Sequence, residues 1–206
     1  MVDLSSYEKL PISFYKNPDV VTIARQLVGK FLFTNIGGKL TAGKIVETEA
    51  YNGRDDRACH AFQKRTPRTE VMYAEGGRAY VYLCYGIHHL FNIVTNKEGL
   101  ADAVLVRAVE PVIGIDIMQD RRGEKVKSHK LTAGPGTLTQ ALGITRSFDK
   151  VSLLEDQIWV AESHDEEIQI GVDRRVGVDY AGEDAKLPWR FFIEGNEFVS
   201  VKKRNP

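Results

Sequence analysis

The stretch that decides the fold is FLFTNIGGKLTAGKIVETEAY, residues 31–51. Two runs rich in apolar and β-branched residues flank the pair Gly37-Gly38, and this pattern predicts two strands. A Gly-Gly pair between strands indicates a β-hairpin, because the central residues of its tight turn need positive φ angles. An antiparallel pair is therefore expected to begin the sheet.

Outward from this hairpin, strands outnumber helices and do not alternate with them. A helix is predicted over 17–30, with Asn17 as its cap, Pro18 in its first position and Gly29 at its end. A further helix is expected over 112–122, and residues 134–144 are expected to form a loop followed by a short helix. Further strands are expected over 78–86, 91–96, 103–111, 157–162, 167–172, 189–195 and 198–203. The pattern predicts one α+β domain over residues 1–206, with its core in about 10–203, built on a curved, mostly antiparallel sheet with flanking helices.

The composition is that of an ordinary globular protein, with 43% hydrophobic and 27% charged residues. No run approaches the roughly 18 apolar residues that cross a bilayer. The first residues also lack the basic and apolar regions of a signal peptide. We expect a cytoplasmic protein, associated with the nucleoid if bacterial, whose two cysteines, Cys59 and Cys84, stay reduced.

The net charge is zero, with 28 Lys and Arg against 28 Asp and Glu, which argues against nucleic-acid binding by bulk charge. The distribution is uneven: residues 1–150 carry 21 basic against 16 acidic residues, and residues 151–206 carry 7 against 12. One positive face is therefore compatible with the sequence.

The two carboxylates of VETEAY, Glu47 and Glu49, lie two residues apart in an apolar strand. Strand alternation places them on one face with Ile45 and Tyr51, which look buried. A solvated strand face is the ordinary setting for such residues. A carboxylate near apolar surface instead needs a partner, and it can act as a general base that activates water.

Several other side chains are candidates for a site. Tyr82 lies in the aromatic strand YVYLCYG, where ordinary packing and a shelf for a stacked base are both open. Arg107 lies among valines, so it faces outward or pairs with a carboxylate. The pair His88-His89 does not form a metal site, because adjacent strand residues point to opposite faces.

Two further segments are candidates for phosphate contacts. The run RRGEKVKSHK, residues 121–130, is either a solvated loop or a stretch that contacts phosphates through Arg121 and Arg122. The glycines Gly134 and Gly136 of GPGT precede a predicted helix, whose free N–H groups could hold a phosphate.

Seven blocks in a fixed order resemble the alkyladenine (3-methyladenine) DNA glycosylases from about residue 10 onward. They are VETEAY, GRDDRACH, TPR, YVYLCYG with Asn92 after it, VLVRAVEP, AGPGTLTQAL, and RVGVDYAG followed by PWRF. The resemblance implies a monofunctional enzyme of base-excision repair that needs no metal or organic cofactor. It also implies a single mixed domain that acts as a monomer on double-stranded DNA containing damaged purines, without a membrane. The implied substrates are 3-methyladenine, 7-methylguanine and hypoxanthine, with ethenoadenine as a further candidate.

The resemblance also implies roles for individual residues. Glu49 would deprotonate the attacking water, which Arg107 and the backbone carbonyl of Ala50 would hold. The flipped base would lie among the side chains of Tyr51, His60 and Tyr82, with Asn92 excluding normal guanine, and Tyr85 would fill the gap left in the duplex. The chain departs from the family pattern at His88 and His89, where aromatic or apolar residues are common, and at Ala61, where serine is common.

Two other function classes are compatible with parts of the sequence. A nucleosidase or sugar hydrolase could use Glu47 and Glu49 on small molecules. It would have no use for an aromatic strand end at Tyr85 or for a basic run. A non-catalytic nucleic-acid-binding module would have no use for a carboxylate at Glu49 beside a phosphate backbone.

Overall fold

The hairpin predicted around Gly37-Gly38 is present in the computed structural model, which describes residues 4–162 and 167–201. Strand β2 (Phe31–Ile36) pairs antiparallel with β3 (Lys39–Asn52), and both turn glycines have positive φ. The fourteen residues of β3 make it the longest of the described strands. Its length lets it border β2 with its first half and β9 (Arg190–Ile193) with its second half.

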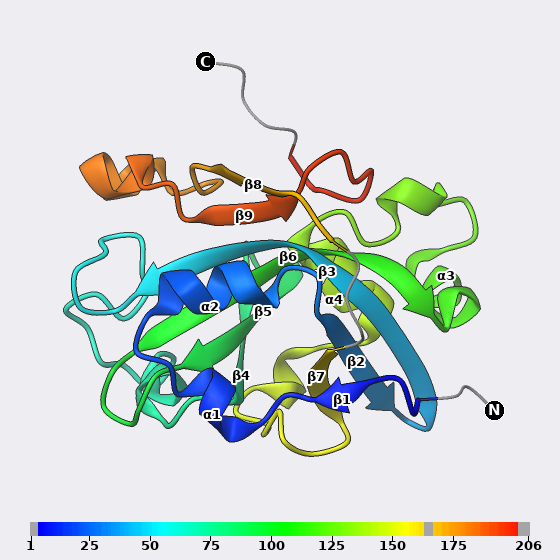
Figure 1. Ribbon diagram of the computed structural model, residues 1–206, viewed down its shortest axis with the longest axis horizontal. Coiled ribbons are helices and arrows are strands. Elements are labelled where there is room, and N and C mark those ends of the chain that lie inside the picture. Colours follow the sequence, from blue (N-terminus) through cyan, green and yellow to red (C-terminus); the bar gives the residue numbers. More distant parts are fainter. Residues whose placement is uncertain (1–3, 163–166, 202–206) are drawn as a thin grey trace.

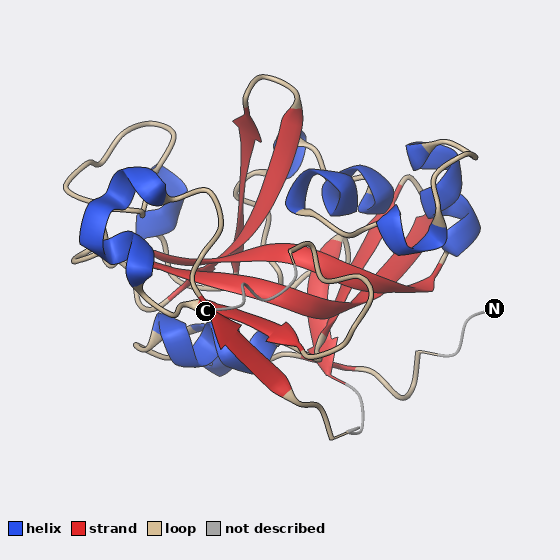
Figure 2. Cartoon of the chain, turned by 90° about the horizontal axis from the view of Figure 1, so that it is seen from above, coloured by secondary structure: helices blue, strands red, loops and turns tan. Residues whose placement is uncertain are grey.

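Antiparallel pairing continues through the whole sheet, which curls around a core (Figures 1 and 2). The strand order is β1-β7-β2-β3-β6-β5-β4, and β9 joins β3 to β8. The remaining strands are β1 (Glu8–Lys9), β4 (Arg78–Cys84), β5 (His88–Thr95), β6 (Asp102–Ile113), β7 (Ile158–Glu162) and β8 (Ile170–Asp173). The α+β prediction with a mostly antiparallel sheet in a single domain is confirmed.

Four α-helices and several 3-10 turns flank the sheet within the described ranges. The helices are α1 (Ile12–Tyr15), α2 (Val20–Leu27), α3 (Ile115–Arg122) and α4 (Pro135–Leu142), and the 3-10 segments are Glu70–Tyr73, Ser128–Lys130, Arg146–Phe148 and Asp179–Lys186. Helix α2 packs on β3 and β6, whereas α4 packs on β5 and β6 (Figure 1). Apolar side chains of α2, α3 and α4 all enter the same main core. None of these helices is long and apolar enough to cross a membrane.

The start of α2 differs from the prediction that Asn17 caps it. Asp19 is the N-cap, and its Oδ1 accepts from the backbone N–H groups of Val21 at 3.0 Å and Thr22 at 3.2 Å. Asn17 instead accepts from the Asp19 N–H at 2.9 Å. Both residue types make good caps, so the sequence alone did not decide between them.

One strand boundary and one whole strand also differ from the predictions. Strand β6 continues past Pro111 to Ile113. The register between β3 and β6 shifts beside Gly43, and at such an irregularity a proline, which has no N–H, can lie within a strand. The strand predicted over 198–203 is absent from its described part, residues 198–201, which form turns. Residues 202–203 lie outside the described residues.

A pair of β-bulges sets which side chains of β3 and β6 share a face. Ile45 pairs with Val109 and Glu47 with Ala108, so Val46 is an extra residue on β3. The expectation that Ile45 shares a face with Glu47 is wrong, because this bulge interrupts the alternation and Ile45 packs in the main core. Beyond the bulge, Glu47, Glu49 and Tyr51 follow the expected alternation.

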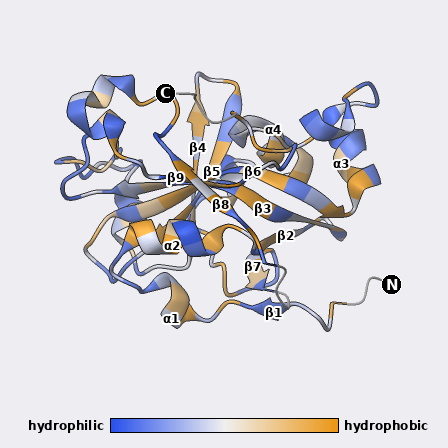
Figure 3. Cartoon of the chain, turned by 45° about the horizontal axis from the view of Figure 1, so that its top comes forward, coloured by the Kyte–Doolittle hydropathy of each residue, from blue (hydrophilic) through white to orange (hydrophobic). Residues whose placement is uncertain are grey.

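Strands β4 and β5 form a hairpin that projects from the rest of the sheet (Figure 3). Cys84 pairs with His88, so the tip consists of Tyr85, Gly86 and Ile87. This hairpin and the second half of β3 frame the candidate site described next.

Candidate active site

A cavity of about 390 Å³ opens between the β4–β5 hairpin, the loop after β3 and the segment around Val176–Tyr180. This volume falls within the range of small-molecule sites. Six of the predicted site residues line it, namely Tyr51, His60, Tyr82, Tyr85, Asn92 and Arg107. They come from five separate parts of the chain, and the fold brings them to one place.

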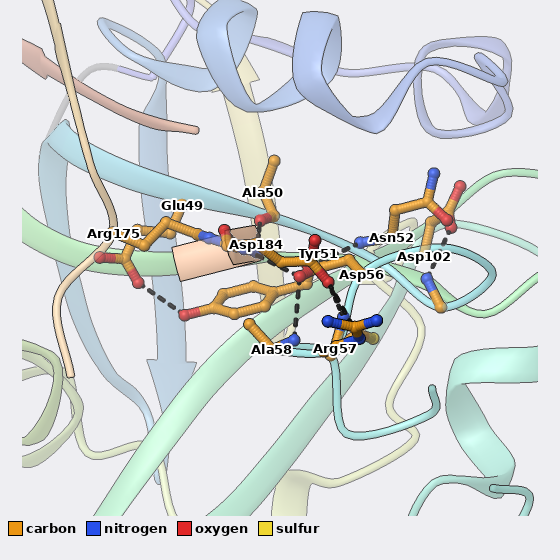
Figure 4. A network of polar contacts seen from close by, with 12 residues as sticks. Glu49, Ala50, Tyr51, Asn52, Asp56, Arg57, Ala58, Asp102, Arg175 and Asp184 are labelled. Atoms are coloured by element: carbon orange, nitrogen blue, oxygen red, sulfur yellow. Dashed lines mark hydrogen bonds and ion pairs between the residues drawn. The ribbon is translucent and has the colours of Figure 1, made fainter. Parts of the chain in front are cut away.

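Glu49 lies immediately behind the wall of this cavity and is fully buried. Its Oε2 accepts from the Tyr51 hydroxyl at 2.7 Å (Figure 4). Its Oε1 accepts from the Val176 N–H at 2.7 Å. The Nη1 of Arg107 is 3.3 Å from the same Oε1. All three partners line the cavity. A carboxylate offers about four lone-pair positions, and these three donors occupy three of them.

Arg107 reaches both glutamates because it is the extra residue of the second bulge. Glu47 pairs with Ala108 and Thr48 with Val106, which leaves Arg107 without a direct partner on β3. Its Nε donates to Glu47 Oε1 at 3.0 Å, while its Nη1 lies beside Glu49. Burial opposes its charge, but the adjacent Glu49 and Glu47 outweigh this effect and raise the pKa of Arg107 above its usual value.

Glu47 is fully buried like Glu49, and neither glutamate is itself among the residues that line the cavity. Its Oε1 accepts from Arg107 and from Arg190 Nη1, each at 3.0 Å, and its Oε2 accepts from the Ser200 N–H at 2.6 Å. Neither glutamate therefore belongs to a solvated strand face. The two carboxylates differ in their donors: all three donors of Glu49 line the cavity, whereas only Arg107 among the donors of Glu47 does.

A buried ion pair between Arg175 and Asp56 supports the other side of the cavity. Arg175 donates from Nη2 to Asp56 Oδ1 at 2.8 Å and from Nη1 to the Ala50 carbonyl at 2.9 Å. Its guanidinium lies 4.8 Å from the centre of the Tyr51 ring. The structure thus gives one lone pair of the Ala50 carbonyl to Arg175 (Figure 4).

Tyr51 is held between this arginine and Glu49. Burial is the main cause that raises the pKa of its hydroxyl well above the usual value, and the charge of Glu49 adds to it. The hydroxyl therefore stays protonated and donates to Glu49 at neutral pH. Sequence reasoning missed Arg175 and Asp56, although each lies in a quoted block, because 119 positions separate the partners and no local spacing indicates the pair.

His60, Tyr80 and Tyr82 form an aromatic wall of the cavity. The rings of His60 and Tyr82 meet edge to face, with centroids 4.7 Å apart. Arg68 donates from Nε to the Tyr80 hydroxyl at 3.2 Å, and this hydroxyl lies 3.0 Å from His60 Nδ1. Arg68 Nη2 also lies 3.2 Å from His60 Nε2, so a guanidinium that can only donate faces both ring nitrogens of His60.

Arg68 is a further site residue that sequence reasoning did not assign, although it closes the block TPR. Its guanidinium lies 4.9 Å from the Tyr82 ring, and its Nη2 is 3.0 Å from His60 Nδ1. His60 is exposed as a residue, but its ring nitrogens face these neighbours. Burial of the ring, followed by the charge of Arg68, lowers the pKa of His60 to about 4. His60 is therefore neutral at physiological pH.

Asn92 lies on β5 at the floor of the site and is 4% exposed. Its Nδ2 donates to the backbone carbonyl of Tyr80 at 3.1 Å, which fixes the amide against the wall. Asn92 pairs with Leu105 of β6, which also lines the cavity.

Tyr85 stands at the tip of the β4–β5 hairpin and is 92% exposed. Tyr85 and Gly86 both have positive φ, and the Ile87 N–H donates to the Cys84 carbonyl at 3.2 Å. Positive φ at both central residues is the pattern of a type I′ turn. The ring is thus held away from the core at the mouth of the cavity.

The two arginines predicted to contact phosphates end α3 and bind acceptors within the protein. Arg121 Nη1 donates to the Ala141 carbonyl at 3.0 Å. Arg122 donates from Nη1 to Gln140 Oε1 at 2.6 Å and from Nε to the Leu131 carbonyl at 3.1 Å. These bonds tie α3 to the C-terminal end of α4. Phosphate contact by these residues stays a prediction.

The glycines predicted to bind phosphate open α4. Gly134 is its N-cap, and Gly136 lies so close to His88 that a Cβ there would approach the imidazole to 2.9 Å. The lack of a side chain at Gly136 lets α4 approach His88, which lies on β5 directly after the tip of the β4–β5 hairpin. Their predicted role with phosphate also stays a prediction.

Within residues 4–162 and 167–201, no group of three or more His, Cys, Asp and Glu side chains is placed to hold a metal ion. Cys59 and Cys84 are both free thiols. Glu49 and the residues that line the cavity provide a carboxylate, guanidiniums, phenols, an imidazole, an amide and the thiols of Cys59 and Cys84.

Comparison with known proteins identifies the family of the chain. The family model described as methylpurine-DNA glycosylase (MPG) matches residues 13–197. Three relatives carry the description "Putative 3-methyladenine DNA glycosylase". The Clostridium acetobutylicum protein is 41% identical, covering 96% of this chain and 100% of the relative. The Desulfitobacterium hafniense protein is 44% identical (95% and 100%), and the Chlamydia felis protein is 47% identical (89% and 95%). The chain therefore belongs to the methylpurine-DNA glycosylase family.

Proposed function

We propose that this chain is a monofunctional DNA glycosylase of base-excision repair that acts on duplex DNA as a monomer. It turns alkylated or deaminated purines out of the duplex and hydrolyses the N-glycosidic bond, which leaves an abasic site. The single observation that carries this proposal is the buried carboxylate of Glu49 directly behind an aromatic cavity of purine size.

The cavity offers aromatic surfaces on which a single base can stack. A base inside a duplex is inaccessible at its sugar carbon, so it must leave the stack before water can attack. Tyr51, Tyr82 and His60 present rings on which a purine can stack. A damaged pair costs less to open, which favours damaged purines over normal ones.

Glu49 is the proposed general base for the attacking water. Its three donors, Tyr51, Arg107 and the Val176 N–H, fix its orientation. The carboxylate accepts the proton of water as the oxygen bonds to the sugar carbon and the glycosidic bond breaks. Its negative charge also stabilises the oxocarbenium-like sugar of the transition state. Arg107 and the Ala50 carbonyl are proposed to hold this water.

The leaving group decides how much acid assistance is needed. Alkylated purines such as 3-methyladenine and 7-methylguanine already carry positive charge and leave without strong protonation. Hypoxanthine and ethenoadenine are neutral and need a proton. His60, with its lowered pKa of about 4, does not supply one efficiently at neutral pH. The site thus favours cationic purines for chemical reasons.

Hydrolysis without strand cleavage fits the side chains of the cavity. A glycosylase that also cuts the strand forms a Schiff base through an amine. The side chains that line the cavity in the described part of the chain include no lysine. Water activated by Glu49 is therefore the proposed nucleophile.

The exposed hairpin tip favours a DNA substrate over a small nucleoside. Tyr85 at the mouth can enter the duplex and fill the space of the flipped base, as wedge residues do. A nucleosidase has no use for an exposed ring in a constrained turn. A binding module, in turn, has no use for Glu49.

The proposal is tested with duplexes that each carry one lesion, incubated with the protein in EDTA while released free base is measured. Glu49→Gln keeps the shape of the side chain but cannot accept a proton, so single-turnover excision should fall by about 10²–10⁴-fold or more. Binding to the same duplexes should persist. Glu155→Gln, at an exposed position away from the cavity, is the matched control. Wild-type rates in Glu49→Gln would exclude the proposed role.

A further inference from the structure

The segment around Ser200 reaches the buried arginines and carboxylates behind the cavity from the far end of the sequence. The Ser200 N–H donates to Glu47 Oε2 at 2.6 Å, and Arg107 Nη2 donates to the Ser200 hydroxyl at 3.2 Å. One residue further on, the Val201 carbonyl accepts from Arg190 Nη1 at 2.9 Å. Three hydrogen bonds thus connect two consecutive residues to this charged cluster.

Glu47 depends on this segment for one of its two oxygens. Its Oε1 is shared by Arg107 and Arg190, and its Oε2 receives the Ser200 N–H. A fully buried carboxylate must be paired and hydrogen-bonded, because an unsatisfied oxygen retains its desolvation penalty. Loss of the Ser200 donor would therefore free Glu47 to reorient.

The plane of the Arg107 guanidinium is set by the same contacts. Its Nε binds Glu47 and its Nη2 binds Ser200, and these two bonds direct the remaining Nη1 toward Glu49 at 3.3 Å. The guanidinium is a rigid planar fork, so two fixed nitrogens determine the position of the third. Ser200 thereby orients the Arg107 guanidinium beside Glu49, the proposed general base, although Ser200 does not line the cavity.

The segment is fixed in place by its own anchors. Phe198 packs with Val46 and Ala108, at the bulged part of β3 and β6. Asn196 donates from Nδ2 to Glu110 Oε2 at 2.7 Å, and its Oδ1 accepts from the Phe198 N–H at 2.9 Å. The segment therefore docks on the sheet at the irregularity that also places Arg107.

We propose that Ser200 is a positioning residue which, through its hydroxyl and through Glu47, holds Arg107 in register with Glu49 for the chemical step. This inference rests on the proposed glycosylase function. It predicts that the segment over residues 196–201, called here the C-terminal latch, affects the rate of bond cleavage rather than the affinity for DNA. The latch lies behind the carboxylates, whereas DNA would approach at the cavity mouth beside Tyr85.

Three substitutions of Ser200 separate its two contacts. Ser200→Thr keeps both the N–H and the hydroxyl, Ser200→Ala keeps only the N–H, and Ser200→Pro also removes the N–H. A hydrogen bond to a charged group contributes enough to change a rate by about 10- to 100-fold when it is lost. We expect wild-type single-turnover rates for Ser200→Thr, a loss of about 3- to 10-fold for Ser200→Ala and about 10- to 100-fold for Ser200→Pro.

The control measurements distinguish positioning from general destabilisation. Affinity for a duplex with a stable abasic-site analogue should stay within about twofold for all three variants. Ser147→Ala, an exposed serine bonded to Thr145, should match the wild type in every measurement. If Ser200→Pro does not fold, the comparison of Ser200→Ala with Ser200→Thr decides the outcome.

A readout on Arg107 itself keeps this test independent of activity. The exchange of the Arg107 Nε–H with solvent, followed by ¹⁵N NMR, should be slow in the wild type and in Ser200→Thr but faster in Ser200→Ala and Ser200→Pro. Unchanged exchange and unchanged rates in both of the latter variants would overturn the positioning role. Absence of base release by the wild type would instead refute the proposed function. The NMR comparison would still show whether Ser200 fixes the Arg107 side chain.

Discussion

Tyr85 adopts a backbone conformation that tyrosine rarely takes, with φ of +50° beside a glycine that also has positive φ. Asparagine followed by glycine is the preferred pair for such a turn, and an L-residue with a large side chain is disfavoured there by about 1–2 kcal/mol. The ring is 92% exposed, so packing does not compensate for this strain. A role outside folding explains the tyrosine best.

Tyr85→Asn should therefore raise the free energy of unfolding slightly, by up to about 1 kcal/mol, while duplex excision falls. The loss arises because an inserted ring no longer offsets the unstacking of the base. Urea denaturation and single-turnover excision measure the two effects, and the loss should shrink when the lesion lies opposite a gap. A drop in stability of about 3–5 kcal/mol, typical of a buried aromatic residue, would contradict the wedge.

His60 gives the site a defined response to pH. Its pKa is lowered to about 4 in the folded protein, whereas an unfolded histidine titrates near 6.5. Between these values the unfolded chain binds more protons, so the free energy of unfolding should decrease as the pH falls through this window. Above pH 6.5 this group adds no pH dependence.

Arg68→Gln tests the cause of this shift. Removing the positive charge beside His60 should raise the His60 pKa and make the decrease in stability with falling pH shallower. NMR titration of the imidazole signals measures the pKa directly, with Arg65→Gln as a control whose side chain binds Glu70 instead. An unchanged pKa in Arg68→Gln would leave burial as the sole cause.

Among the elements, the paired bulges of β3 and β6 show where sequence reasoning reached its limit. Hydrophobic alternation and the Gly37-Gly38 turn were sufficient to predict the hairpin and most strands of the sheet. A bulge depends on the register between two strands far apart in sequence, so alternation within β3 alone misplaced Ile45. The same reason concealed the partners of Arg107 and the pairing of Asp56 with Arg175. By contrast, six of the residues that line the cavity were named from the resemblance of their blocks, although Arg68 and Val176 were not.

The Asp56–Arg175 pair joins the loop after β3 to the segment after β8, and both side chains are fully buried. Asp56→Asn and Arg175→Met should each destabilise the protein by about 3–5 kcal/mol, because each leaves one buried charge without its partner. The double substitution should cost clearly less than the sum, since neither charge then remains. Urea denaturation of the four proteins gives the coupling energy. Strict additivity would show that the two charges do not stabilise each other.

At the scale of the whole molecule, strands from the last third of the chain complete the sheet. Strand β7 lies between β1 and β2, and β9 borders β3 beside the site. Trp159 of β7 stacks on Phe33 with ring centroids 5.0 Å apart, while Trp189 lies next to the Arg175 guanidinium. The two tryptophans therefore report on opposite parts of one sheet.

Unfolding should be a single cooperative transition seen equally by both tryptophans. In Trp159→Phe and in Trp189→Phe, the remaining fluorescence signal and far-UV circular dichroism should give the same urea midpoint within each variant. Comparing two signals within one variant removes the effect of the substitution on stability. Separate midpoints would indicate that the part around the site unfolds independently of the part around β7.

The position of the C-terminal latch has a consequence for synthesis of the protein on the ribosome. Chains emerge from the amino terminus, so Glu47, Glu49 and Arg107 leave the ribosome long before Ser200 and Val201 do. Until then Glu47 lacks the donor for one of its oxygens, and β3 lacks β9 along its second half. On the proposed function, a nascent chain that already contains every cavity-lining residue would therefore release base more slowly than the folded protein until the residues of the latch have emerged and docked.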